Sequence, residues 1–372
     1  MSILNPGATI GVLGSGQLGR MMAQAASRLG YHVACFSPDA SPTPCAQVGA
    51  REVTGSYDDL EAVAAFAKSV DVVTFEFENV SSAAAETAAK YAPVRPGGHV
   101  LHTTQNRLRE KRFLQKIGVP TAAFQAVESA SDCDSFHYPA ILKTAGFGYD
   151  GKGQRKVGSA AEAKAAFLEL GEQACILEEL VAFAYEASIV AVRGSDGSFV
   201  AFPLVRNDHV NHILDLTTVP LAGSAEAEAL AQGILEALEV VGVLCVELFV
   251  TPEGQLLVNE LAPRPHNSGH WSIEGAATSQ FEQQVRAVCG LPLGSTALRA
   301  PGVAMANLLG DLWPADETSA PDWAAALAVP GLHLHLYGKA QARKGRKMGH
   351  LTALAATSEE AVQMVLRARQ LL

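Results

Sequence analysis

Apolar runs of strand length alternate with helix-like segments over the first hundred residues. The apolar runs lie at 8–14, 31–37 and 71–78. The segments that follow them have the apolar spacing of helices and lie at 17–29, 58–69 and 81–92. Strands that alternate with helices usually pair in parallel, so this pattern predicts an open parallel α/β sheet for residues 1–100.

The middle of the chain follows a different pattern, in which turn residues join apolar runs directly. The predicted strands are 138–145, 174–181, 187–194, 198–205, 243–250 and 255–262, with one more at 332–338. Helices are predicted at about 103–117, 224–240, 322–328 and 358–371. Pro252-Glu253-Gly254 separates the strands at 243–250 and 255–262, and short turns of this kind join antiparallel strands. We therefore expect an α+β domain after the α/β domain.

Composition limits the class of protein and its partners. The chain has 372 residues, enough for two or three domains, and 48% of them are hydrophobic. The net charge of −10 argues against general affinity for nucleic acid or an anionic membrane. An anionic substrate must therefore meet a local basic cluster.

Cysteine usage and the N-terminus indicate a cytoplasmic protein. The six cysteines include no C-x-x-C pair, which is typical of reduced thiols in the cytosol. The first residues have neither a basic region nor a long apolar region, as a signal peptide would. No apolar run reaches the roughly 18 residues that a membrane-spanning helix needs. We expect no membrane association.

The first motif with chemical meaning is G-x-G-x-x-G, formed by Gly14, Gly16 and Gly19 after an apolar run. A dinucleotide site would also need an acid at the end of the second strand. That strand ends in Ser37, and Asp39 comes two residues too late. The dinucleotide interpretation stays open at this point beside two alternatives: another phosphate ligand at the helix N-terminus, or close packing of strand against helix.

The second motif is Lys143 on a predicted strand, followed by the glycine-rich segment 146–154. A strand lysine beside a glycine-rich loop can neutralise and cover the phosphates of a nucleotide. No Gly-Lys-Ser/Thr opens a helix here, so the segment is not a Walker loop. The alternative is a hairpin loop with an ordinary surface lysine.

The third motif is a pair of glutamates on the two strands of one predicted hairpin. Glu247 and Glu260 each interrupt an apolar run, where an unpaired charge is costly. Two carboxylates on adjacent strands can share a Mg²⁺ ion that also binds ATP phosphates. The alternative is that both acids point outward from a half-buried sheet.

The fourth motif is the segment APRPHNSGHW at 262–271, directly after the second glutamate. It crowds hydrogen-bond donors into one loop, which suits a small oxyanion. Zinc fits poorly, because Pro265 precedes His266, Gly269 precedes His270, and no helix presents both histidines on one face. A loop held only by its own hydrogen bonds is the alternative.

The fifth motif is a basic segment at 338–350, in a chain of negative net charge. Five of its residues are cationic: Lys339, Arg343, Lys344, Arg346 and Lys347. A turn of this composition can hold a phosphate, or it can be a solvated surface turn.

In this order, these motifs resemble those of the ATP-grasp superfamily over essentially the whole chain. The matching phrases are GSGQLGRM, TFEFENV, TQNRLREK, GYDGKGQ, NELAPRPHNSGHW and GRKMGHL. More narrowly, the chain resembles the 5-(carboxyamino)imidazole ribonucleotide synthases, the ATPase subunit of phosphoribosylaminoimidazole carboxylase. The resemblance implies a Rossmann-like pre-ATP-grasp domain at 1–100, a lid subdomain at 101–182, a catalytic subdomain at 183–298 and a small C-terminal lobe at 299–372.

The resemblance also implies roles for individual residues. The implied ATP contacts are Arg107, Lys143, Gly148, Tyr149, Asp150, Gly151, Lys152, Gly153, Gln154, Glu178, Glu179, Leu180, Val181, Glu186, His209, Asn259 and Glu260. The implied magnesium ligands are Glu247 and Glu260, and the bicarbonate loop is Arg264, His266, Asn267 and Ser268. The implied contacts to the ribonucleotide are Gln17, Glu76, Tyr149, Asp150, Lys339, Arg346 and Lys347. Phe147 departs from the family, which often has glycine there.

The implied reaction joins bicarbonate to 5-aminoimidazole ribonucleotide at the expense of ATP, through carboxyphosphate, in a cytoplasmic homodimer. Lys143 and Arg264 would neutralise charge, Asp150 would handle the amine proton, and the cofactor would be Mg²⁺ rather than NAD. One rival is a formate-using ATP-grasp transformylase, which lacks the APRPHNSGHW loop. A silent nucleotide-binding regulator would be expected to lose a magnesium glutamate or the lysine. A dehydrogenase lacks a correctly placed acid for the ribose.

Overall fold

The computed structural model describes residues 3–146, 153–314 and 320–372. The first domain contains a parallel sheet in the order β3-β2-β1-β4, so the predicted α/β sheet is confirmed. Its strands are β1 (Thr9–Leu13), β2 (His32–Ser37), β3 (Arg51–Thr54) and β4 (Val72–Phe75). Its helices are α1 (Gln17–Arg28), α2 (Leu60–Ala67) and α3 (Ser82–Ala88), with a 3₁₀ turn η1 at Ala46–Val48. The pattern missed β3 because this strand has four residues, of which only one is aliphatic.

Two helices connect this domain to the rest of the chain, where one was predicted. These are α4 (Gly98–Thr104) and α5 (Arg107–Lys116). The prediction of a single helix at 103–117 was wrong because Asn106 caps α5, its side chain accepting the N–H of Arg109 at 3.1 Å. Asparagine is among the strongest N-cap residues, so it starts a new helix here.

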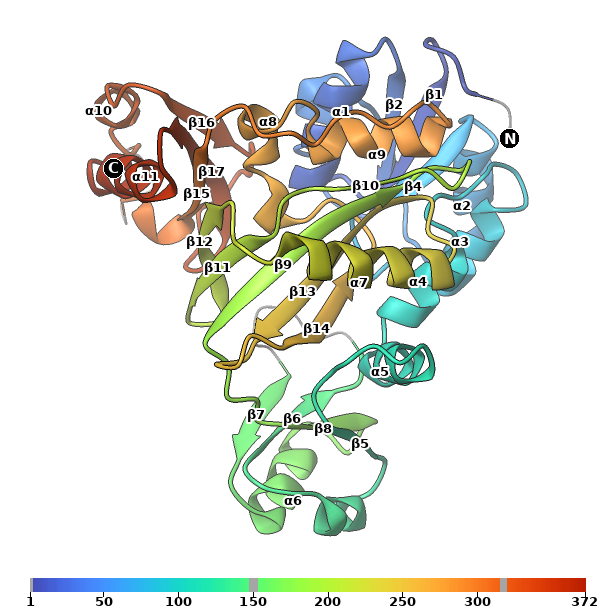
Figure 1. Ribbon diagram of the computed structural model, residues 1–372. Coiled ribbons are helices and arrows are strands. Elements are labelled where there is room, and N and C mark those ends of the chain that lie inside the picture. The colour runs from blue at the N-terminus through green and yellow to red at the C-terminus, as the bar shows by residue number, and fades with distance from the viewer. Residues whose placement is uncertain (1–2, 147–152, 315–319) are drawn as a thin grey trace.

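A small antiparallel sheet in the order β5-β8-β6-β7 forms the next unit, at the bottom of Figure 1. Its strands are β5 (Phe124–Val127), β6 (Ala140–Thr144), β7 (Gln154–Val157) and β8 (Cys175–Glu179). It also contains α6 (Ala160–Glu169) and the 3₁₀ turn η2 (Ala130–Ser135). Leu142, Phe167 and Leu177 are buried between this sheet and α6. The predicted strands at 138–145 and 174–181 are confirmed.

The largest sheet has the order β14-β13-β9-β11-β12-β15-β17-β16, with β10 beside β9. Its first strands are β9 (Tyr185–Arg193), β10 (Phe199–Ala201), β11 (Val205–Val210), β12 (Ile213–Val219), β13 (Gly242–Val250) and β14 (Leu256–Ala262). The C-terminal part adds β15 (Gly302–Leu309), β16 (Leu332–Leu336) and β17 (Lys347–Ala355). The remaining helical segments are α7 (Ser224–Ala237), η3 (Asn267–Gly269), α8 (Ser272–Gly275), α9 (Gln280–Cys289), η4 (Gly310–Leu312), α10 (Trp323–Leu327) and α11 (Ser358–Gln370).

The two faces of this large sheet have different chemistry. Helix α7 lies along one face of this sheet (Figure 1). Ile189, Leu244 and Val246 are fully buried in an apolar cluster with residues of α7. Because side chains alternate along a strand, Ser188 and Glu247 point to the opposite face. Glu247 and its register partners Ser188 and Glu260 therefore share the face that α7 does not cover.

The C-terminal strands continue the same sheet, because β15 pairs with β12 and β17 pairs with β15. Helix α11 covers one side of these strands, where Ala306, Leu351 and Val365 are buried. We did not foresee β17, since the basic residues and glycine before it resembled a turn. Within the described ranges, no helix combines the length and the apolar character that a membrane span requires. All six cysteines are buried and unpaired.

Candidate functional site

The glycine-rich loop after β1 is closed by a carboxylate of its own domain. Glu76, which follows β4, accepts the N–H groups of Gly16 at 2.5 Å and Gly19 at 2.8 Å. A phosphate at the start of α1 would need these same donors. A Cβ at Gly14 would overlap with Cγ of Glu76, so glycine is needed for this approach. Burial raises the pKa of Glu76, although the two N–H groups oppose this effect. The geometry favours the packing role of G-x-G-x-x-G over a dinucleotide role.

The basic segment meets the first domain beside this loop. The Nζ atom of Lys339 donates to Oε1 of Gln17 at 2.5 Å and to the carbonyl of Lys347 at 2.6 Å. Gln17 is the first residue of α1, directly after the glycine-rich loop. Arg346 lies on the same turn, and its guanidinium donates to the carbonyl of Gln341 at 2.9 Å. The structure thus brings the predicted ribonucleotide contacts of two distant segments together.

The strand lysine is paired with a carboxylate on the next strand. Nζ of Lys143 lies 2.7 Å from Oε2 of Glu178, and both side chains are largely buried. Burial alone would raise the pKa of Glu178, but the charge of Lys143 lowers it. Arg107 begins α5 nearby and donates from Nη1 to the carbonyl of Thr144 at 3.2 Å. Arg107, Lys143 and Glu178 therefore lie around the end of β6.

The glycine-rich segment itself is only partly described. Gly153 accepts the N–H of Thr144 at 2.9 Å, and Gln154 begins β7. The other predicted residues of this segment lie outside the described residues, namely Phe147, Gly148, Tyr149, Asp150, Gly151 and Lys152.

The predicted contacts to the nucleoside surround the end of β8 and the start of β9. Glu179 is exposed at the end of β8, and Leu180 and Val181 after it are half-buried. Glu186 on β9 lies 2.7 Å from Nδ1 of His209 on β11. Glu178 and Lys143 share one face of the small sheet, and Glu179, the next residue along β8, points to the other face.

The two predicted metal carboxylates lie directly opposite each other. Glu247 on β13 pairs in register with Glu260 on β14, as the hairpin prediction required. The register then shifts, so Leu248 faces Val258, and Asn259 is the extra residue of a bulge. Burial, and after it the charge of Glu247, raise the pKa of Glu260. Two acids that oppose each other's ionisation suit a shared cation.

These two carboxylates alone do not complete the coordination shell of a metal ion. In the described parts of the chain, no group of three or more His, Cys, Asp and Glu side chains is arranged to hold a metal ion. Mg²⁺ commonly binds one or two carboxylates and takes its other ligands from water and substrate phosphates. The pair therefore fits Mg²⁺ delivered with a nucleotide.

Arg264 forms a bidentate pair with a carboxylate that we did not foresee. Its Nη2 atom lies 2.8 Å from Oε1 of Glu78, and its Nε atom donates to the other oxygen. Glu78 belongs to the first domain and follows β4, two residues after Glu76. Burial would raise the pKa of Glu78, but Arg264 lowers it. No local pattern could reveal this contact, since 186 positions separate the two residues.

Two buried charges on α5 were also missed. Glu110 accepts the N–H of Leu261 at 3.0 Å, and Lys111 donates to the carbonyl of Val258 at 3.0 Å. Both side chains thus hold the backbone on either side of Glu260. Burial and the charge of Glu260 raise the pKa of Glu110 well above its usual range. The signal in the sequence was weak, because charged residues on a short helix are usually solvated.

The loop after Arg264 is fixed by one glutamine side chain. Oε1 of Gln280 accepts the N–H of His266 at 2.9 Å, and its Nε2 donates to the carbonyl of the same residue at 2.7 Å. His266 in turn places Nε2 3.0 Å from Oε1 of Glu247. Burial opposes the charge of Glu247, but His266 lowers its pKa to about 2. The loop and the first metal carboxylate therefore form one hydrogen-bonded unit.

The side-chain amide of Asn267 in this loop has no hydrogen-bond partner among the described residues. The side chain is 7% exposed, and neither Nδ2 nor Oδ1 has a hydrogen-bond partner among the described residues. Buried amides are nearly always paired in folded proteins, and a bound ligand, ion or water is one explanation of an exception. An oxyanion would accept from Nδ2, and its hydroxyl group would donate to Oδ1.

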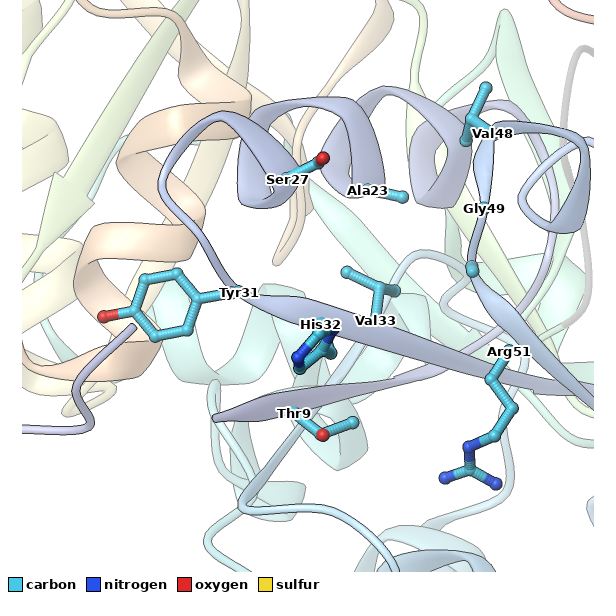
Figure 2. A pocket seen from close by; sticks show the side chains of 10 residues that line it. Thr9, Ala23, Ser27, Tyr31, His32, Val33, Val48, Gly49 and Arg51 are labelled. Carbon is cyan, nitrogen blue, oxygen red and sulfur yellow. The ribbon is translucent and has the colours of Figure 1, made fainter. Parts of the chain in front are cut away.

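A cavity of about 380 Å³ elsewhere in the first domain does not belong to this site. It lies between α1 and the amino-terminal ends of β1, β2 and β3, where Thr9, His32 and Arg51 line it (Figure 2). Ligands of open parallel sheets bind at the carboxyl ends of the strands, where Glu76 lies.

Models of three protein families match successive parts of the chain. They describe a ribonucleotide synthetase preATP-grasp domain at residues 7–105, an ATP-grasp domain at 112–281 and a phosphoribosylaminoimidazole carboxylase C-terminal domain at 303–364. The N5-carboxyaminoimidazole ribonucleotide synthase of Bacillus subtilis is 42% identical and is matched over 98% of this chain and 96% of its own length.

Two further relatives differ in length and in what they contain. A bifunctional purine synthesis protein of Dictyostelium discoideum is 43% identical over 94% of this chain, which spans 37% of that longer protein. The crystal structure of N5-carboxyaminoimidazole synthase from Aspergillus clavatus, in complex with ADP and 5-aminoimidazole ribonucleotide, has a TM-score of 0.88. It is 31% identical, and the match covers 98% of each chain.

Proposed function

This chain belongs to the N5-carboxyaminoimidazole ribonucleotide synthases, ATP-dependent ligases of purine biosynthesis with the ATP-grasp fold, and we propose that it carboxylates 5-aminoimidazole ribonucleotide with bicarbonate. The observation that carries the choice of bicarbonate is the buried amide of Asn267, unpaired among the described residues, in the loop that His266 joins to Glu247. ATP would lie between the small sheet and the large sheet, near Lys143 and Glu186. The ribonucleotide would lie between Gln17 and the basic segment.

The first chemical step would form carboxyphosphate. A bicarbonate oxygen attacks the γ-phosphorus of ATP, the bond from that phosphorus to the β-γ bridging oxygen breaks, and ADP leaves. Arg264 and Asn267 orient the bicarbonate, and Lys143 neutralises charge that develops on the phosphoryl oxygens. Glu247 and Glu260 would hold Mg²⁺, which supplies further charge neutralisation when it is bound.

The second step would transfer the carboxyl group to the ribonucleotide. The amine of 5-aminoimidazole ribonucleotide attacks the carboxyl carbon, either in carboxyphosphate or in CO₂ released from it, and phosphate leaves. Asp150, outside the described residues, is our candidate for the group that takes the amine proton. An Asp150→Asn enzyme should lose turnover but still bind the ribonucleotide; undiminished turnover would remove this role. A homodimer and a cytoplasmic location stay predictions.

The decisive experiment measures ADP release with ATP, Mg²⁺ and bicarbonate, with and without the ribonucleotide. We expect strong stimulation by the ribonucleotide and acid-labile incorporation of labelled bicarbonate. ADP release with formate instead of bicarbonate would overturn the choice of substrate, and no ADP release with any acceptor would favour a silent nucleotide binder. Glu260→Gln should abolish the activity, whereas Glu253→Gln, in the exposed turn of the same hairpin, should not.

A further inference from the structure

Four buried polar side chains form a continuous hydrogen-bonded chain from β12 to the loop after β14. Oγ1 of Thr217 donates to Oδ1 of Asn207 at 3.0 Å, and Nδ2 of Asn207 donates to Oγ of Ser188 at 2.8 Å. Oγ of Ser188 then donates to Oγ of Ser268 at 2.7 Å. Asn207 is 4% exposed and the other three are fully buried. We call these four residues the relay.

The register of the strands places the relay on the face that carries the site. Ser188 lies directly opposite Glu247 across the β9–β13 pair. Asn207 lies opposite Glu186 on one side and opposite Thr217 on the other. The relay therefore runs under the proposed ATP and bicarbonate sites without reaching solvent.

The relay ends on the loop and on a proposed metal carboxylate. Oγ of Ser268 lies 2.9 Å from Nδ1 of His266, whose Nε2 lies 3.0 Å from Oε1 of Glu247. A carboxylate oxygen only accepts, so Nε2 must carry a proton for this contact to be a hydrogen bond. The orientation of the His266 ring is thus fixed from one side by Ser268 and from the other by Glu247.

Stability alone does not explain why these positions are polar. Replacing both partners of a buried hydrogen bond by apolar groups of the same shape is often neutral or stabilising. A fully paired network instead selects one arrangement of its side chains, because every alternative leaves a buried polar group unpaired. Such selection matters for a loop whose atoms must meet a small ligand, and the relay ends at the loop that we propose binds bicarbonate.

We propose that Ser188, Asn207 and Thr217 are positioning residues for bicarbonate, acting through Ser268 and His266. The proposal rests on the proposed function. None of the three touches the ligand in this scheme. They set the orientation of the His266 ring, and through it the geometry of Glu247 and of the loop that binds the anion.

The test compares substitutions at two distances from the loop. Ser188→Ala should raise the KM for bicarbonate about 10-fold, in the range found for groups that orient ligand-binding residues. Thr217→Val removes the hydroxyl at the far end and keeps the shape, so it should cause a smaller rise in the same constant. Thr217→Ser keeps the hydroxyl and should restore the wild-type value. The KM for ATP should change little in all three. The Tm should fall in Ser188→Ala and Thr217→Val, because each leaves a buried partner unpaired, but not in Thr217→Ser.

Thr352→Val provides the matched control. Thr352 is a buried hydroxyl on β17 of the same sheet, and its Oγ1 has no hydrogen-bond partner among the described residues. The relay proposal is overturned if Ser188→Ala and Thr217→Val leave the KM for bicarbonate unchanged, as this control should, or if they raise the KM for ATP as much as the KM for bicarbonate. If the wild-type enzyme showed no dependence on bicarbonate, the proposed function would fail and the relay proposal with it.

Discussion

Two loops in this molecule follow a β-strand and lie beside glutamates, but they differ in whether their polar groups are hydrogen-bonded within the protein. In the loop after β1, the N–H groups of Gly16 and Gly19 are taken by Glu76. In the loop after β14, the buried amide of Asn267 has no partner among the described residues. Folding normally pairs buried polar groups, so the first loop is complete as it stands, whereas the second is one in which we propose that a ligand supplies the missing partner. The motif that first suggested a dinucleotide site is thus the one in which the N–H groups of Gly16 and Gly19 are already bound.

The largest effect is expected for Asn267→Ala in the second loop. Removing an amide that binds only substrate should lower kcat/KM for bicarbonate about 10²–10³-fold, the cost of losing one donor to a developing oxyanion. The free energy of unfolding should not fall, since no hydrogen bond of the ligand-free protein is lost. Steady-state kinetics and urea unfolding on the same preparation check both parts. A loss of stability alongside the loss of activity would mean that Asn267 has a partner within the protein, as the N–H groups of the first loop do.

The first loop should respond in the opposite way to Gly14→Ala. Gly14 has φ of +117°, and a Cβ there would overlap with Glu76, so we expect a loss of about 2–3 kcal/mol in unfolding free energy. Gly49→Ala is the control, because Gly49 has φ of +95° with open space around its Cβ. It should cost only about 1 kcal/mol. Equal losses in the two variants would mean that the close contact between Gly14 and Glu76 adds nothing to the unfolding free energy.

A smaller effect is expected at Glu78, which joins the two regions by binding Arg264. The folded-state pKa of Glu78 is lowered, so its contribution is present above the ordinary carboxyl pKa and is lost as the pH falls through the folded value. At pH 7, Glu78→Gln should cost about 1–2 kcal/mol of unfolding free energy. Urea unfolding at several pH values should show this difference shrinking below about pH 4.5. A difference that stays constant with pH would contradict the ion pair.

The smallest effect is expected for an ion pair far from both loops. Lys164 and Asp134 lie 2.7 Å apart, but their side chains are 38% and 59% exposed. Asp134→Ala should change the unfolding free energy by about 0.5 kcal/mol or less and leave turnover unchanged. A larger change would mean that ion pairs stabilise this protein even where they are exposed. Burial would then not explain the difference between the two loops.

Local pattern predicted those parts of the fold whose residues are close in sequence. The parallel strands of the first domain and the hairpin that opposes Glu247 to Glu260 were both expected, because strand periodicity and turn residues encode them directly. The break between α4 and α5 was missed, although Asn106 carried the signal as a capping residue. Strand β17 was missed because its first residue belongs to a basic cluster that also suits a turn.

The supporting contacts of the site were beyond local pattern. Glu78 reaches Arg264 from another domain, and Ser188 reaches Ser268 across 80 positions. Each is an ordinary polar residue in its own segment. Its role becomes visible only when the fold brings its distant partner within hydrogen-bond distance. The residues proposed to touch ligands could be carried over from a resemblance, whereas those that hold them in place had to be found in the structure.

The continuous sheet from β14 to β16 has a consequence for anyone who shortens this chain. Cutting it near residue 299 would remove β15 and leave β12 as an open edge with unpaired N–H and carbonyl groups. Such an edge is a template for strands of other molecules. The C-terminal part therefore also covers the edge of β12. A truncated form should precipitate, rather than merely lose a substrate contact.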